Sequence, residues 1–369
     1  MKILLQGRLD LLSRYGGDTY LIKSLQKGLL KSGIHSDVST YSENTLPEFD
    51  IIHFFGIMRI HDLYPYFLQA KKYHKKIIVT PIYENLNLLD KYGRVGWEGF
   101  FANILSNDLK ELGKGLLRAV KDKKQLKSAF LQFLAPYSKQ QKDILSSADS
   151  IFVTSYGEMN DLRKKFAIPK SRFSIVPICI DKENSQAGED LFVRKYGLRN
   201  FVVSVGRIEP KKNQLNILKA IKDTEIEILF IGSTSLYHMS YVNDFLKQLR
   251  NTPNAKYLGY LDRKMLLSAY AAANVHVLAS WFEVIGVVNL EAAINGCNIV
   301  TTANGYTKEY LGNLAWYCDP AKVDSIKTAI IKAYNSTRRN NLKNLILERY
   351  TWDKIIPKII EVYKDVLKK

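Results

Sequence analysis

Short runs of Val, Ile, Leu and Phe alternate with longer amphipathic stretches along the whole 369-residue chain. Each run is long enough for a strand but too short for a helix, and continuous apolar runs of this length are typical of strands buried on both faces. Since helical patterns separate the runs, the sequence predicts the α/β class, with parallel sheets covered by helices. The expected strands cover residues 2–6, 36–40, 50–56, 76–80, 150–155, 173–177, 201–205, 226–231, 275–278 and 298–301.

The length of the chain indicates two domains, because a typical domain takes roughly 150 residues. A polar stretch between the two strand–helix series contains Asn184, Ser185 and Gly188, and we interpret it as a linker. Doubly wound domains bind ligands at the carboxyl ends of their strands, so a site is expected in the cleft between the domains. The expected parts are a Rossmann-like domain at 1–181, a linker at 182–199, a second Rossmann-like domain at 200–350 and a last helix at 351–369.

The chain is strongly basic. Fifty-four Lys and Arg against 36 Asp and Glu give a formal net charge of +18, which predicts an anionic partner such as phosphates, a membrane face or nucleic acid. Nucleic acid is disfavoured, because the sequence has no G-x-x-x-x-G-K-[ST] loop, no zinc knuckle and no RNP-like aromatic stripe. Three widely separated cysteines form neither a disulfide framework nor a metal-binding pattern.

The sequence also bears on where the protein is located. Its first residues lack the pattern of a signal peptide, and no apolar run reaches the ~18 residues that cross a bilayer. We therefore expect a cytoplasmic protein. Residues 106–142, with nine Lys and Arg against three Asp and Glu, predict a basic amphipathic helix. This helix either holds the protein peripherally on the anionic inner face of the cytoplasmic membrane or packs on the core with a solvated basic face.

Two cations lie in the loop after the strand at 201–205. Gly206 and Arg207 follow the strand directly, and Lys212 precedes a helical pattern at 215–221. Arg can bind phosphate through two parallel hydrogen bonds, and Lys provides a point charge. Their place at the carboxyl end of a strand suits a diphosphate, while a solvated basic loop is the alternative.

Two carboxylates follow the strand at 275–278. Glu283 lies in the loop after it, and Glu291 lies eight positions later on the helix that the loop opens. Gly286 between them allows close approach of backbone to a ligand, and the helix start offers N–H groups to phosphate. Carboxylates beside a diphosphate suit the hydroxyl groups of a sugar, which donate hydrogen bonds to them.

These motifs, followed by Gly-Cys-Asn-Ile-Val-Thr at 296–301, resemble glycosyltransferase family 4 of the bacterial surface-polysaccharide type. The resemblance runs from Gly16-Gly17 to Tyr-Thr-Trp at 350–352, nearly the whole chain. It implies the GT-B fold: two facing Rossmann-like domains, the first on the acceptor side and the second binding a nucleotide-sugar, with a carboxyl-terminal helix that crosses back to the first. It also implies retention of anomeric configuration.

The resemblance implies a role for each matching residue. Arg207 and Lys212 would hold the diphosphate and neutralise it as it leaves. Glu283 would face the donor sugar, and Glu291 would bind the ribose hydroxyl groups. The other implied donor-binding positions are Gly16, Gly17, Gly206, Tyr260, Ile285, Gly286 and Val287.

One family feature is missing. A histidine that many relatives carry after the fourth strand is replaced here by Tyr83-Glu84, either of which is a candidate substitute. His53 is a third candidate, although its place within an apolar run equally suits a core histidine. The absence of any Asp-x-Asp triplet disfavours a metal-dependent enzyme of the GT-A type. We expect no metal ion and no cofactor, since the nucleotide-sugar is the donor substrate.

The function predicted from these features is transfer of a hexose from a UDP- or GDP-sugar to a saccharide or lipid-linked saccharide in lipopolysaccharide or capsule synthesis. The expected mechanism is front-face substitution, in which the leaving phosphate accepts the proton of the acceptor hydroxyl. Alternatives are a catalytically silent GT-B subunit that binds a partner or a nucleotide, and a sugar-nucleotide epimerase. Retention of both cations and both carboxylates argues against the silent subunit.

Overall fold

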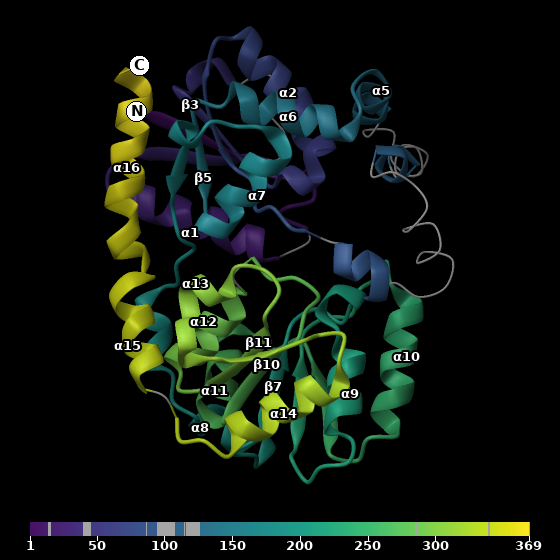
Figure 1. Ribbon diagram of the computed structural model, residues 1–369. Coiled ribbons are helices and arrows are strands. Elements are labelled where there is room, and N and C mark those ends of the chain that lie inside the picture. Colours follow the sequence, from purple (N-terminus) through teal and green to yellow (C-terminus); the bar gives the residue numbers. More distant parts are fainter. Residues whose placement is uncertain are drawn as a thin grey trace. The chain divides into compact units, whose positions relative to one another are not determined.

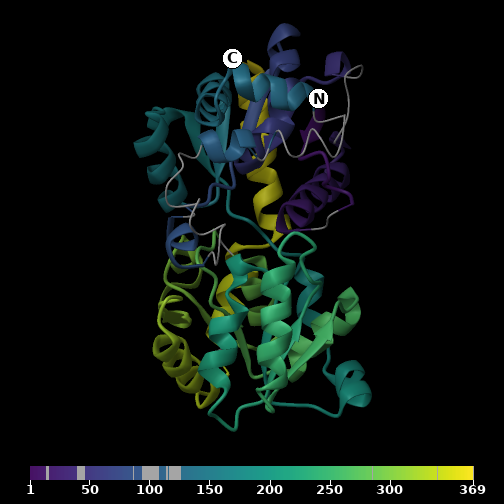
Figure 2. The ribbon, with the colours of Figure 1, turned by 90° about the vertical axis from the view of Figure 1, so that its right-hand side faces the viewer.

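The computed structural model contains two parallel six-stranded sheets, each with helices on both faces (Figures 1 and 2). The chain divides into two compact units, one formed by Met1–Tyr83, Ile104–Cys179 and Trp352–Lys369, the other by Glu84–Asn103 and Ile180–Thr351. The structure describes residues 1–13, 16–39, 46–85, 87–93, 108–113, 115, 126–284, 286–338 and 340–368. Within these residues, no helix is both long enough and apolar enough to cross a membrane.

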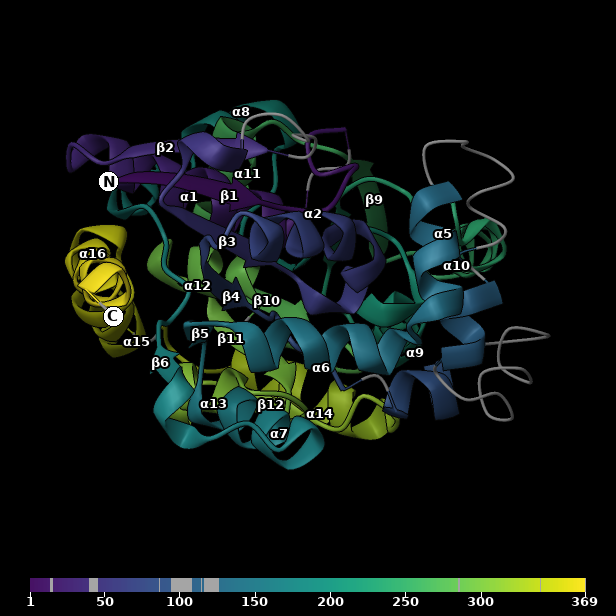
Figure 3. The ribbon, with the colours of Figure 1, turned by 90° about the horizontal axis from the view of Figure 1, so that it is seen from above.

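The sheet of the first unit has the strand order β2-β1-β3-β4-β5-β6, which Figure 3 follows from one edge to the other. All neighbouring strands are parallel. Its strands are β1 (Lys2–Gln6), β2 (His35–Ser39), β3 (Ile51–Phe55), β4 (Lys76–Thr80), β5 (Ser150–Val153) and β6 (Phe173–Ile175). The helices are α1 (Gly17–Lys31), α2 (Ile60–Lys72), α5 (Leu126–Leu134), α6 (Tyr137–Ser147), α7 (Tyr156–Phe166) and α16 (Trp352–Lys368), with short helices η1 (Leu46–Glu48), η2 (Ile57–Arg59) and η5 (Lys170–Arg172).

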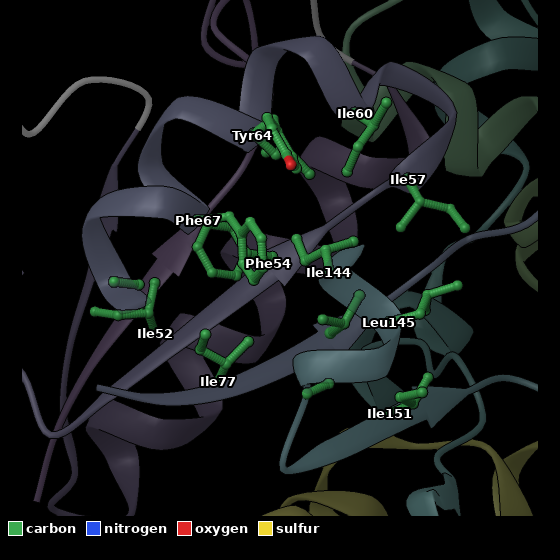
Figure 4. Close-up of a cluster of buried hydrophobic side chains, with 14 of the residues drawn as sticks. Ile52, Phe54, Ile57, Ile60, Tyr64, Phe67, Ile77, Ile144, Leu145 and Ile151 are labelled. Atoms are coloured by element: carbon green, nitrogen blue, oxygen red, sulfur yellow. The ribbon is translucent and has the colours of Figure 1, made fainter. Parts of the chain in front are cut away.

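Successive residues of β3 face opposite sides of this sheet. Ile52 and Phe54 point into an apolar core that α2, α6 and α7 complete, and Figure 4 shows these side chains against the first two of these helices. His53 contacts Tyr363 of α16 on the other face, where α1 also lies. Because side chains alternate along a strand, a fully buried strand must be apolar on both faces, which explains the continuous apolar run.

α16 packs against α1 in the first unit. A Cβ atom on Gly28 would lie 2.4 Å from Cδ1 of Ile356, so the glycine lets the two helices approach closely. The Tyr363 hydroxyl and Nδ1 of His53 are 2.7 Å apart, and Oγ1 of Thr80 lies 2.7 Å from Nε2. Burial lowers the pKa of His53 to about 3, so this histidine is a neutral core residue.

The prediction of one basic amphipathic helix across 106–142 is wrong for the described part of that range. Two helices, α5 and α6, are separated there by Ala135 and Pro136. Pro136 has an extended ψ of 155° and precedes the first turn of α6, a position where its missing N–H costs nothing. Lys114, Arg118, Lys121, Lys123 and Lys124 lie outside the described residues.

The sheet of the second unit has the order β12-β11-β10-β7-β8-β9, again all parallel. Its strands are β7 (Val202–Val205), β8 (Ile228–Ile231), β9 (Ala255–Gly259), β10 (Val275–Leu278), β11 (Asn298–Thr302) and β12 (Trp316–Cys318). Its helices are α8 (Asp190–Tyr196), α9 (Gln214–Ile221), α10 (Met239–Arg250), α11 (Arg263–Ala272), α12 (Val287–Ile294), α13 (Thr307–Leu311), α14 (Val323–Tyr334) and α15 (Asn340–Arg349). Short helices are η3 (Leu89–Gly93), η6 (Lys182–Gln186), η7 (Pro210–Lys212) and η8 (Gly312–Leu314).

The expected linker at 182–199 is not a free connection. It contains η6 and α8, and α8 packs on α11 within the second unit. Phe192 is fully buried there, its ring 5.3 Å from that of Phe201, and its N–H donates to Oγ of Ser268. The polar composition of this stretch suggested a linker, but the buried Phe192 side chain anchors it to the second unit.

Candidate functional site

The strand order of the second sheet reverses at β7. The chain leaves β7 for β8 on one side and returns to β10 on the other, so the loops that follow β7 and β10 diverge from neighbouring strand ends. Such a switch point opens a crevice at the carboxyl edge of a parallel sheet, and ligands bind there in open α/β folds. Both predicted second-domain motifs lie in these two loops.

Three loops at this edge are tied together by hydrogen bonds. Asn213, which follows η7, donates from Nδ2 to the carbonyl of Ala279 at 3.0 Å and to that of Pro320 at 2.9 Å. The N–H of Trp281 donates to the carbonyl of Lys211 at 3.1 Å. The loops after β7 and β10 are therefore fixed against each other, and their side chains meet in a defined geometry.

Lys212 and Glu283, predicted on separate loops, form an ion pair with 2.5 Å between Nζ and Oε1. The Glu283 side chain is 7 % exposed, and the aliphatic stem of Lys212 runs beside Gly206. Burial alone would raise the pKa of the Glu283 carboxyl, but the charges of Lys212 and Lys211 outweigh it and lower the pKa below its ordinary value. Glu283 is therefore a carboxylate at neutral pH.

The backbone of Glu283 is held on both sides. Its N–H donates to the carbonyl of Asn304 at 3.2 Å, and its own carbonyl accepts from the N–H of Tyr306 at 3.0 Å. Between these residues Gly305 has φ of 111°, and a Cβ there would lie 1.9 Å from the Glu283 carbonyl oxygen. Only glycine fits this contact, which sets the position of the Glu283 carboxylate.

Lys211 is a third cation of the site that the sequence analysis did not single out. Its Nζ lies 2.5 Å from Oε1 of Glu84, and Arg207 lies 3.5 Å from Glu209. Burial would lower the pKa of Lys211, but Glu84 and Glu283 together raise it above the ordinary value. The described loops thus gather Arg207, Lys211 and Lys212 with three carboxylates. Lys211 was missed because neighbouring lysines look alike in sequence, and its partner is 127 positions away.

Glu84 and Tyr83, two of the three candidates for the missing family histidine, have different surroundings. Glu84 pairs with Lys211, as described above. The Tyr83 ring is buried in the core of the first unit, and its hydroxyl accepts from Lys165 at 3.2 Å. Of the two, Glu84 alone contacts the cations of the second unit.

The start of α12 is held by a buried polar chain. Gly286 caps the helix with φ of 67°, and Asn289 in the first turn has its Oδ1 2.9 Å from Nδ1 of His276. Nε2 of His276 faces the N–H of Val205 at 3.4 Å, and Asn289 donates to Oγ1 of Thr301. Burial lowers the pKa of His276 to about 3, so the ring stays neutral. This chain joins three strands to the first turn of α12.

Glu291 lies further along α12 and is separate from the Lys212–Glu283 pair. Its side chain is 5 % exposed, and its Oε1 lies 2.8 Å from Nη2 of Arg263 at the start of α11. Burial raises the pKa of the Glu291 carboxyl above its ordinary value, and Arg263 opposes that rise. The sequence motifs that led to Glu291 did not indicate Arg263 as its partner.

The remaining predicted positions are placed as follows. Tyr260 follows β9 and is 77 % exposed, Val287 is the first residue of α12, and Ile285 lies outside the described residues. Gly16 caps α1 of the first unit, and Gly17 begins that helix. The loop before them carries Arg8, whose Nε lies 2.6 Å from Asp18, so charged pairs hold this glycine turn.

Part of the second unit matches a known protein family. Residues 192–349 match the family model of the glycosyl transferases group 1. An uncharacterized glycosyltransferase of Methanocaldococcus jannaschii is 23 % identical over 95 % of this chain and 94 % of its own length. The O-antigen chain mannosyltransferase B of Escherichia coli is 25 % identical over 61 % of this chain and 63 % of its own length.

A solved structure extends the likeness to the whole fold. HepE of Anabaena in complex with UDP-glucose has a TM-score of 0.73 at 14 % identity, covering 99 % of this chain and 100 % of the other. The predicted α/β fold of GT-B type is thereby confirmed. The family match thus relates residues 192–349 to the glycosyl transferases group 1, and the structural likeness shows that the whole chain has the GT-B fold.

Proposed function

We propose that the protein transfers a hexose from a UDP- or GDP-sugar to a saccharide or lipid-linked saccharide acceptor in the synthesis of a surface polysaccharide such as lipopolysaccharide or capsule. The observation that carries this proposal is the Lys212–Glu283 ion pair at the switch point of the second sheet. It combines a phosphate-binding cation with a buried carboxylate suited to sugar hydroxyl groups.

The donor would bind at the carboxyl edge of this sheet. Its diphosphate would lie against Arg207, Lys211 and Lys212, and the sugar against Glu283. The ribose would meet Glu291 and the base the loop that contains Tyr260. The UDP-glucose bound by HepE and the mannosyl transfer named for the Escherichia coli relative support a nucleotide-sugar donor and a saccharide product.

The proposed reaction is a front-face substitution with retention. The bond between the anomeric carbon and the diphosphate oxygen breaks, the acceptor oxygen bonds to that carbon from the same face, and the acceptor proton passes to the leaving phosphate. Glu283 is ionised, so its part is to hold sugar hydroxyl groups and to stabilise positive charge on the ring. The cations would neutralise the leaving diphosphate without a metal ion.

Nucleotide binding without metal is the first test. With UDP or GDP at 100 times its dissociation constant and EDTA present, the stabilisation should be about 2.7 kcal/mol. For a unit of this size that corresponds to a rise in the melting temperature of roughly 5–10 °C. ADP and CMP serve as comparison ligands in the same thermal-shift panel. A rise that appears only when Mn²⁺ or Mg²⁺ is added would contradict metal independence.

A lipid-linked acceptor would require the protein to reach a membrane surface. α5 supports this part of the proposal, because Leu131 packs on the core while Phe130, Phe133 and Leu134 are 63 %, 75 % and 63 % exposed. Adjacent exposed aromatic and aliphatic side chains on a basic protein suit the interface of an anionic bilayer.

Liposome binding tests this surface. Replacing Phe130, Phe133 and Leu134 by serine should reduce the bound fraction on phosphatidylglycerol vesicles at least about tenfold, since each buried side chain contributes roughly 1.5–3 kcal/mol. The matched control replaces Leu236 and Tyr237, which are 81 % and 65 % exposed on the second unit. Equal losses in both variants, or no loss in the first, would show that α5 is not the membrane contact.

A further inference from the structure

Arg263 is the one charged side chain that the structure places in direct contact with Glu291 among the described residues. The geometry points to Arg263 as a positioning residue for the donor ribose: its guanidinium pairs with the Glu291 carboxylate and orients it for the ribose hydroxyl groups. This inference rests on the proposed donor site and adds to it a residue that determines how the nucleoside is recognised.

The position of Arg263 in its helix is the first argument. It is the first residue of α11, directly after the cap Asp262, whose Oδ1 accepts from the N–H of Met265 at 3.0 Å. A cation in the first turn opposes the helix dipole, so local helix stability does not explain an arginine there. Its side chain instead reaches across to α12, which packs against α11 in the second unit (Figure 1).

The burial of Glu291 is the second argument. Its side chain is 5 % exposed, whereas that of Arg263 is 41 % exposed. A buried carboxylate without a partner takes up a proton, and a protonated carboxyl loses acceptor capacity for hydroxyl donors. Arg263 supplies the compensating charge, and it can do so at little cost because its own guanidinium remains partly in water.

The ion pair leaves acceptor capacity on the Glu291 carboxylate. A carboxylate offers about four lone-pair directions, and the ion pair joins Nη2 of Arg263 to Oε1 at 2.8 Å. Hydroxyl groups can therefore bind the same carboxylate while Arg263 stays in place. Arg263 also lies two residues after Leu261, the last residue of the loop from Gly259 that is expected to hold the base. One residue therefore connects base and ribose recognition.

Among the described residues, three titratable groups interact with Glu291 from the elements packed around α12. They are Arg263 and Tyr270 on α11, and Asp181 just before η6. Asp181 raises the pKa of Glu291, whereas Arg263 lowers it. Burial raises the pKa of Tyr270 well above its ordinary value, so this phenol stays neutral and does not replace the guanidinium charge. Removing Arg263 must therefore raise the pKa of Glu291 further.

The test compares a ribonucleotide with its analogue that lacks both ribose hydroxyl groups. UDP or GDP, whichever binds more tightly, and its 2′,3′-dideoxy form are titrated into the full chain between pH 5.5 and 8 by calorimetry. The readout is the ratio of the two affinities. A loss of global stability lowers the affinities for both ligands together. Loss of the Glu291 carboxylate as a hydrogen-bond acceptor lowers only the affinity for the ribonucleotide.

In the R263M variant this ratio should fall about 10- to 100-fold at pH 6.5, as expected for loss of hydrogen bonds to a charged group. The ratio should rise again toward the upper end of this pH range, because a larger fraction of Glu291 is ionised at higher pH. R263K should retain part of the ratio, and E291Q should lose it at every pH. K264M removes the same charge from the next residue of α11 and should leave the ratio unchanged.

Two results would overturn the inference. An unchanged ratio and pH profile in R263M would reduce Arg263 to a contact between helices, and tighter ribonucleotide binding in R263M would make it a competitor of the ribose. Both differ from a failure of the proposed function, in which the unaltered protein binds neither UDP nor GDP.

Discussion

Replacing Lys212 by methionine should lower kcat by about 10²- to 10³-fold, as expected when one preorganised donor to a developing negative charge is lost. Nζ of Lys212 lies at the carboxyl end of β7, where it meets Glu283 at 2.5 Å, and the leaving diphosphate gains its charge in the transition state. The larger effect should therefore fall on kcat rather than on KM. Steady-state kinetics with the donor found in the thermal-shift panel measures both constants.

The controls separate chemistry from stability. K212M leaves the buried Glu283 carboxylate with Lys211 as its remaining cation, and breaking a buried pair can destabilise by several kcal/mol. The double variant K212M/E283Q removes this unpaired charge and should restore the melting temperature without restoring turnover. K219M, an exposed lysine of α9, should change neither. Normal turnover in K212M would remove Lys212 from the proposed site.

Replacing Tyr363 by alanine should destabilise the first unit by about 3–5 kcal/mol, the range for loss of a large buried aromatic side chain. Tyr363 is fully buried, its ring stacks 5.7 Å from that of Phe152, and its hydroxyl lies 2.7 Å from Nδ1 of His53. Truncation leaves a cavity under α16 and a buried imidazole nitrogen without its partner. The urea midpoint of the unfolding transition, followed by circular dichroism, measures the effect.

Two further variants test the cause of this loss of stability: one removes only the hydrogen bond, and the other is a control at an exposed tyrosine. Y363F keeps the ring and removes only the hydrogen bond, which should cost about 1–3 kcal/mol for the buried nitrogen left behind. Y156A removes a tyrosine that is 61 % exposed on α7 and should stay within about 0.5 kcal/mol of the unaltered protein. If Y363A unfolded at the same urea concentration as Y156A, α16 would not be an integral part of the first core.

The sequence predicted all six strands of the first sheet and the buried strands of the second, but not the edge strands of the second. β1, β4 and β10 have the bounds expected from their runs, because a strand covered on both faces is mostly apolar. β9 and β12 were missed. Both lie at edges of the second sheet, and their burial patterns are mixed, so neither carries a continuous apolar run.

Some residues of the candidate site could be selected from the sequence, and others could be found only in the structure. Arg207, Lys212, Glu283 and Glu291 could be selected from the sequence because strand ends, glycines and charges recur there in a recognisable order. Lys211, His276 and Arg263 could not. Each belongs to the site because of the residue that it contacts, and these partners lie 127, 13 and 28 positions away in the sequence. A local sequence pattern cannot show contacts between residues so far apart.

The sequence by itself determined the α/β class, the loops that carry the charged side chains and the burial of most strands, because these follow from local hydrophobic patterns. Only the tertiary structure decided which charges meet. The order β12-β11-β10-β7-β8-β9 brings the loops after β7 and β10 together, so that Lys212 pairs with Glu283 across 71 positions. Contact between α11 and α12 likewise brings the Arg263 guanidinium to Glu291. A buried charge needs an opposite charge nearby, and the packing of the helices decides which residue supplies it.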